Sequence, residues 1–304
     1  MSPERLKTPR EGNHLLPVMA LLSAVILWGV TFTIVKRAVE DVPPFHFVFY
    51  RFFLGSVVLW LVLRKRLGPL PKPWGFPLCV SLSLLAAFYF QTWGLVHTTP
   101  ARAAFITGLS VLLVPLIGWL TRTETMRLGP VLGTLLAAAG LWCVFGGDSG
   151  SLVLNKGDLI VSGCALAFVG HILFVQQAIR SGATVYSLAL MQCSVVAVCS
   201  APFLLLDPPR AEHFTVTSVL SILAMGTVAT PAFLAQIYAQ RHLTAVQTAV
   251  ILALEPGAAA AFSVAVGVEP LTAGLLVGIS LLSGATVVSE VRLPRRKGSP
   301  QPEF

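Results

Sequence analysis

The chain has 304 residues, of which 55% are hydrophobic and only 11% are charged, and its mean hydropathy is +0.81. This composition excludes an ordinary soluble domain of the same length and predicts a polytopic membrane protein. The formal net charge is +8, but the basic residues gather at the ends of apolar stretches, so the charge predicts membrane topology and not a nucleic-acid partner.

Ten apolar stretches are each close to the roughly 20 residues that cross a bilayer as a helix. In chain order they are 17–37, 44–63, 74–95, 101–120, 128–146, 157–179, 183–206, 215–239, 244–267 and 271–290. The connections between them are short. We therefore expect an all-α membrane protein with ten transmembrane helices, a polar N-terminal segment 1–16 that is not cleaved, a Gly- and Ser-rich linker 147–156 and a disordered tail 291–304.

The distribution of positive charge predicts the orientation of the chain. An even number of crossings puts both termini on one side, and that side collects about fifteen Lys and Arg residues against about six on the other. The positive-inside rule then places both termini in the cytoplasm of a bacterial inner membrane. The expected partners are the lipid bilayer and a small-molecule substrate, and the expected state is a monomer or a weak dimer.

A pattern of residues in the first half returns in the second half at an offset of about 145 residues, typical of an internal repeat. Gln91, His97, Thr99, Glu124, Gly129 and Gly133 recur as Gln236, His242, Thr244, Glu269, Gly274 and Gly278. Because each half holds five stretches, an odd number, the second copy enters the membrane from the opposite side. We therefore predict two inverted five-helix repeats, 17–146 and 157–290, with a substrate site near the midplane at their interface.

The glycine pairs of this pattern have G-x-x-x-G spacing. Gly129 with Gly133, and Gly274 with Gly278, place small residues on one helix face, which favours close helix packing within the monomer or between monomers.

Several polar residues lie inside the apolar stretches and are candidates for a binding site. A cation at the bilayer centre costs about +2.5 to +3.5 kcal/mol, so Arg51 is expected to face protein or water; the alternative is snorkelling to the interface. Together with Glu255 and Pro256, Arg51 is a candidate for coupling or for a hinge. His171 is either a hydrogen-bonded packing residue or a ligand or proton-binding group. Trp28, in the first stretch, is a further candidate.

The third and eighth stretches combine aromatic and amide side chains. Tyr89 and Trp93 share one helix face, while Phe88 and Gln91 share another. Gln236 and Tyr238 repeat the combination in the second half, where Pro231 interrupts the helix. Such a set suits a small ligand with an apolar body and polar ends, and the alternative is ordinary packing.

Glu255 is an acid well inside an apolar stretch. An unpaired carboxylate there is a candidate for proton coupling or for binding an amine, and Pro256 beside it weakens the helix and suggests a hinge. The alternative is that Glu255 caps backbone donors freed at that break.

The sequence contains no motif for catalysis, a cofactor or a metal. It lacks G-x-S-x-G and H-E-x-x-H, and its five cysteines have no C-x-x-C spacing and fall in apolar stretches. We therefore expect no enzyme activity, no cofactor and no metal site.

Four stretches together resemble the EamA-type transporters of the drug/metabolite transporter superfamily. They are the W-G at Trp28, the V-P-P-F at Val42, the T-T-P-A-R-A-A-F-I-T-G-L-S-V-L-L-V-P-L-I run from Thr98 and the L-E-P-G at Leu254. The resemblance covers nearly the whole chain and is strongest to exporters of aromatic amino acids of the YddG type. It implies two inverted five-helix repeats around a cavity that opens alternately to either side, and export of amino acids or related metabolites. Sugars, nucleotide-sugars and drugs are rival substrates on the same scaffold, and a passive channel is a further rival.

Overall fold

The computed structural model describes residues 15–69, 74–124, 128–145, 154–265 and 271–290, and within these ranges the chain is helical and has no strand. Eight helical segments are long and apolar enough to cross a membrane. Two shorter apolar helices, Leu128–Cys143 and Ala273–Ser289, occupy the fifth and tenth predicted stretches. The chain is therefore a multi-pass helical membrane protein. The predicted segments 1–16, 147–156 and 291–304 lie almost entirely outside the described residues.

Six helices form the first half of the chain. They are α1 (Leu15–Asp41), α2 (Pro44–Leu63), α3 (Gly75–His97), α4 (Pro100–Gly108), α5 (Ser110–Leu120) and α6 (Leu128–Phe145). Proline at the first position of α2 and α4 fits there because the first helical N–H groups have no partner within a helix. The side chain of Thr99 caps α4 by accepting a hydrogen bond from the Arg102 backbone N–H.

The second half contains shorter pieces. They are α7 (Lys156–Arg180), α8 (Val185–Ser200), α9 (Pro202–Leu206), the 3₁₀ turn η1 (Ala211–His213), α10 (Val216–Ala224), the π-helical turn η2 (Met225–Ala229), α11 (Pro231–Gln240), α12 (Ala245–Leu252), α13 (Glu255–Ala265) and α14 (Ala273–Glu290). Thr244 caps α12 as Thr99, 145 residues earlier, caps α4, so the sequence repeat has a local structural counterpart.

The structure corrects the prediction that stretch 101–120 is one continuous helix. It is divided at Leu109 into α4 and α5, and stretch 244–267 is divided after Leu252 into α12 and α13. In the second case Pro256 has no N–H to donate to the carbonyl of Leu252, which ends the regular bonding pattern. In the first case no proline is responsible; the break follows Gly108, a residue type that is unfavourable in helices. The predicted interruption before Pro231 is present as the π-helical turn.

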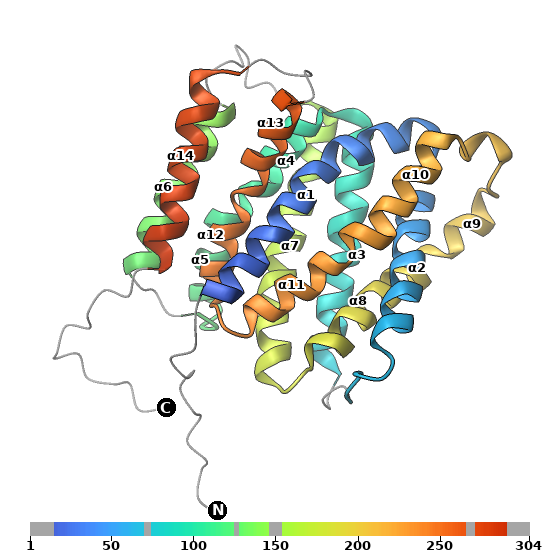
Figure 1. Ribbon diagram of the computed structural model, residues 1–304, viewed down its shortest axis with the longest axis horizontal. Helices are drawn as coiled ribbons and strands as arrows, with labels where there is room; N and C mark the ends of the chain where they lie inside the picture. Colours follow the sequence, from blue (N-terminus) through green and yellow to red (C-terminus); the bar gives the residue numbers. More distant parts are fainter. Residues whose placement is uncertain (1–14, 70–73, 125–127, 146–153, 266–270, 291–304) are drawn as a thin grey trace, which may run out of the picture.

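The helices of the two halves pack in pairs (Figure 1). α3 lies along α7, α2 packs on α8, α1 packs on α11 and α13, and α6 pairs with α14 at one edge of the bundle. The beginning of α1 and the end of α14 lie at the same end of the bundle, here called the terminal end.

The α6–α14 pair requires small residues where the backbones meet. A Cβ on Gly133 would lie 2.9 Å from the Ala285 carbonyl oxygen, and one on Gly274 would lie 2.7 Å from the Cys143 carbonyl oxygen. Both distances are shorter than a carbon and an oxygen can occupy without displacement, so these glycines permit the close approach of the two helices. Gly129 and Gly278 are also buried.

The interior and the exterior are both apolar. Phe32, Phe47, Phe52 and Phe233 are among the largest fully buried side chains. Many leucine, valine and tryptophan side chains are exposed on the outside of the bundle, as expected of a surface that contacts lipid and not water.

Candidate functional site

A cavity lies between helices of both halves. It is lined by Trp28, Thr31, Arg51, Phe88, Gln91, Ala104, Thr107, Gly108, Ser110, Phe168, Ile172, Phe233, Gln236, Leu252, Glu255 and Pro256. An apolar lining with a few placed polar groups is typical of small-molecule sites.

Both interrupted helices reach this cavity. Gly108 and Ser110 flank the α4–α5 break, and Leu252 and Glu255 flank the α12–α13 break. The two breaks touch, because a Cβ on Gly108 would lie 2.8 Å from Cγ of Pro256. Discontinuous helices that meet at a site are typical of secondary transporters.

Aromatic rings form the apolar wall of the cavity. The ring centroids of Trp28 and Phe233 are 5.2 Å apart, and those of Phe88 and Phe233 are 6.1 Å apart. Phe88 and Phe233 are separated by 145 residues, the offset of the sequence repeat, and each lies three residues before a cavity-lining glutamine. Equivalent parts of the two halves therefore supply equivalent parts of the wall.

Five polar side chains of the cavity lack a hydrogen-bond or ion-pair partner among the described residues: Trp28, Arg51, Gln91, Ser110 and Glu255. Arg51 is only 3% exposed and Gln91 only 6%. Buried polar groups are normally hydrogen-bonded, so side chains left unpaired around an open space are available to a ligand.

Gln236 is held differently from Gln91. Its Nε2 donates to Oε1 of Gln240 at 3.2 Å, and Nε2 of Gln240 donates to the Ile172 carbonyl at 2.9 Å. This chain of hydrogen bonds connects α11 to α7 and fixes the amide of Gln236 at the cavity wall.

The guanidinium of Arg51 lies against two aromatic rings. Its Cζ is 4.6 Å from the ring centroid of Phe88 and 5.1 Å from that of Phe52. Cation–π contacts of this kind partly compensate the burial of the charge but use none of its N–H donors.

The structure places four of the predicted binding residues outside this cavity. The Tyr89 hydroxyl donates to the Ser200 hydroxyl at 3.1 Å, Trp93 is 40% exposed on the outer surface, and the Tyr238 ring packs on His242. His171 is fully buried, with Nε2 2.9 Å from Oε1 of Gln192. The predicted residues that the cavity does bring together are Trp28, Arg51, Gln91, Gln236, Glu255 and Pro256.

The helical positions explain this division. Residues three apart share a face, so Phe88 points with Gln91 into the cavity, while Tyr89 and Trp93 point away from it. Phe88, Phe168 and Phe233 are not among the predicted binding residues, although Phe88 is placed on the same helix face as Gln91. Applying the 145-residue offset to Phe88 identifies Phe233, whereas no pattern in the sequence indicates Phe168.

A polar network joins α7 to α4 at the end of the bundle opposite the terminal end. The fully buried Asp158 accepts hydrogen bonds from the Thr98 hydroxyl at 2.6 Å and the Asn155 backbone N–H at 2.9 Å, and it forms an ion pair with Arg102.

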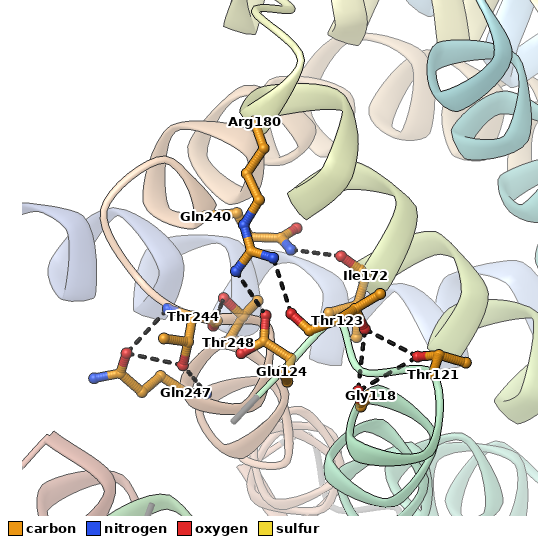
Figure 2. Close-up of polar contacts among 10 residues, drawn as sticks. All are labelled: Gly118, Thr121, Thr123, Glu124, Ile172, Arg180, Gln240, Thr244, Gln247 and Thr248. Carbon is orange, nitrogen blue, oxygen red and sulfur yellow. Dashed lines mark hydrogen bonds and ion pairs between the residues drawn. The ribbon is translucent and has the colours of Figure 1, made fainter. Parts of the chain in front are cut away.

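A second network joins α7 to the segment after α5 at the terminal end (Figure 2). Arg180 donates to Oε1 of Glu124 at 3.2 Å and to the Thr123 carbonyl at 2.9 Å, and the first turn of α12 with Thr244 lies in the same region. α7 and the α4–α5 pair are therefore connected by an ion pair at each end.

Among the described residues, no cluster of three or more His, Cys, Asp or Glu side chains is arranged to hold a metal ion. The polar groups of the cavity are a guanidinium, amides, hydroxyls and one carboxyl group, a set suited to hydrogen-bonding an organic ligand.

A multi-pass helical bundle with broken helices around a central cavity defines the class of membrane transporters. The chain belongs to the EamA-like transporter family, whose model matches residues 15–146 and 155–289, so each half of the chain matches separately. Members of a transporter family are usually not enzymes.

Individual relatives agree with this assignment. An uncharacterized transporter of Archaeoglobus fulgidus is 32% identical over 279 residues, covering 90% of this chain and 86% of the relative. The uncharacterized transporter YoaV of Bacillus subtilis is 23% identical over 289 residues, covering 92% of this chain and 98% of that protein. A crystal structure with 21% sequence identity superposes with a TM-score of 0.76 over 90% of this chain and 97% of that one; at this identity the likeness shows the fold alone.

Proposed function

We propose that the protein is a secondary transporter that exports amino acids, aromatic and other neutral ones, from the cytoplasm by alternating access. The observation that carries this proposal is the aromatic-walled cavity in which Arg51, Gln91 and Glu255 have no partner in the described part of the protein. An amino acid has what such a cavity requires, namely an apolar body and two opposite charges at one end.

The proposed mechanism uses two inverted five-helix repeats. The 145-residue offset relates Thr99 to Thr244 as helix caps and Phe88 to Phe233 as wall residues, which supports the repeat. Five crossings per repeat invert the second copy, and rocking of one repeat against the other would open the cavity to one side at a time. Glu255 is the coupling residue, and Pro256 the hinge beside it.

The proposed orientation places the terminal end in the cytoplasm. Among described residues, Arg64, Lys65, Arg66, Arg122, Arg180 and Arg241 lie at helix ends on this side, and a cytoplasmic excess of positive charge is the usual pattern.

Counterflow tests the proposal. The purified protein in liposomes preloaded with unlabelled phenylalanine should take up labelled phenylalanine transiently and with saturation, and other neutral amino acids should compete. If sugars or nucleotides inhibit uptake and amino acids do not, the proposed substrate class is wrong. Flux that neither saturates nor shows counterflow would indicate a channel.

A further inference from the structure

Arg51 is the one cation among the residues that line the cavity, and it has no anionic partner in the described part of the chain. Its guanidinium carries five N–H donors, and the side chain is 97% withdrawn from solvent, since only 3% remains exposed. An unpaired buried charge is costly unless a partner arrives to meet it. The arrangement is therefore incomplete without an anion in the cavity.

The two rings beside Arg51 hold it in position for such an anion. Phe52 comes from α2 itself and Phe88 from α3, with ring centroids 5.1 Å and 4.6 Å from Cζ. These contacts place no hydrogen-bond acceptor at the guanidinium, so its N–H groups can still bind a second planar group.

We infer that Arg51 is the carboxylate-binding residue of the cavity. This inference rests on the proposed function and names which end of the substrate is bound where. A carboxylate matches the fork of a guanidinium with two parallel hydrogen bonds, a geometry that a lysine cannot reproduce.

The position of Glu255 agrees with this assignment. Arg51 and Glu255 line the same cavity but form no ion pair with each other. Two opposite charges held apart in one cavity are complementary to a zwitterion, with Arg51 on its carboxylate, Glu255 toward its ammonium group and the rings around its side chain. A phosphate ester would leave the carboxyl of Glu255 facing more negative charge, so the cavity favours an amino acid.

Three ligands with the same phenyl ring distinguish the contribution of the substrate carboxylate from that of the substrate amine. They are phenylalanine, 3-phenylpropionate, which lacks the amine, and phenethylamine, which lacks the carboxylate. Dissociation constants are measured for each from the ligand dependence of the melting temperature of the purified protein. The variants are Arg51→Gln, Arg51→Lys and, as a matched charge control, Arg37→Gln on the exposed side of α1.

Arg51→Gln should weaken the binding of phenylalanine and 3-phenylpropionate about 10- to 100-fold, the range for a lost hydrogen bond to a charged group. The same substitution should leave the affinity for phenethylamine unchanged. Arg51→Lys should have an intermediate effect because it keeps the charge but not the fork, and Arg37→Gln should change none of the three. Equal weakening of all three ligands by Arg51→Gln, or none, would overturn the inference.

The ligand series also works without the variants. If Arg51→Gln does not fold, the wild type must still bind phenylalanine more tightly than phenethylamine by a similar factor, and the absence of that preference overturns the inference. Carboxylate binding through Arg51 without counterflow of any amino acid would support this site and contradict the proposed function. If Arg51→Gln retains amino-acid counterflow with unchanged affinity, that result would support the proposed function and contradict this site.

Discussion

Arg51, Gln91 and Glu255 have no side-chain partner in the described part of the chain, whereas Asp158 and His171 do. Asp158 receives several hydrogen bonds and an ion pair, and His171 is paired with Gln192. Asp158 and His171 connect helices, whereas Arg51, Gln91 and Glu255 surround the cavity. Thr92 and Gln176 also have an unpaired buried oxygen but lie outside the cavity lining, so a missing partner indicates a ligand-binding residue only where the side chain also lines the cavity.

Glu255 is the only carboxyl group among the cavity-lining residues, so it is the one lining group that can bind either a substrate ammonium or a proton. Such competition would couple export to proton entry. A gradient of one pH unit supplies about a 10-fold driving force per proton. In liposomes, the wild type should therefore transport phenylalanine faster with a pH gradient than without one.

The Glu255→Gln variant should lose this response to pH and bind phenylalanine more weakly, because the amide has no charge to pair with the ammonium group, but it should retain exchange of labelled for unlabelled phenylalanine at saturating concentration. The amide keeps the size of the side chain but cannot release a proton. A gradient response that persists in this variant would exclude Glu255 as the coupling group.

The interrupted helices are the elements that bring the cavity residues together. Pro256 separates α12 from α13, and Gly108 ends α4 where it meets Pro256. The sequence indicated the break beside Glu255, because proline is visible in it, but not the break at Leu109. There the break follows Gly108, and a single glycine inside an apolar run does not by itself predict the end of a helix.

Pro256→Ala should convert the α12–α13 break toward a continuous helix, because alanine restores the N–H for the Leu252 carbonyl. If Pro256 is the hinge, the variant should melt at a higher temperature and transport more slowly, with little change in substrate affinity. An added barrier of about 1.4 kcal/mol slows a step about 10-fold. Unchanged turnover would show that the conformational change does not involve bending at Pro256.

How far the sequence predicts the site also depends on helix rotation. The repeat pointed to Gln91 and Gln236, which both line the cavity, and the apolar runs indicated the membrane helices. Tyr89 and Trp93 share a face with each other, and the sequence cannot say whether that face or the face of Phe88 turns inward. Packing of α3 along α7 decides it, and this contact joins residues about 60 or more positions apart.

At the scale of the whole molecule, the contacts indicate which parts move together. An ion pair at each end connects α7 to the α4–α5 pair, whereas no ion pair joins α1 to α12 or α13 in the described ranges. Gly29 of α1 instead packs closely against Ala258 of α13. We expect α7, α4 and α5 to move as one body during transport and the contact between α1 and α13 to rearrange.

The proposed orientation can be tested on intact cells. In a variant without the five native cysteines, Lys65→Cys at the terminal end should be protected from a membrane-impermeant maleimide, and Arg210→Cys at the opposite end should be labelled. Both positions are exposed, so access depends on the side of the membrane. The reverse pattern would place the termini outside.

The central claim is that the substrate crosses the membrane through the cavity lined by Gln91 and Gln236. Its most direct test is phenylalanine counterflow by the wild type, Gln91→Ala and Gln236→Ala, with Gln177→Ala on α7, outside the cavity lining, as the control. Loss of one hydrogen bond to the substrate should raise the half-saturation concentration about 3- to 10-fold in both cavity variants, with normal melting temperatures and an unchanged control. Wild-type counterflow kinetics in both Gln91→Ala and Gln236→Ala would contradict the account and place the transport path elsewhere.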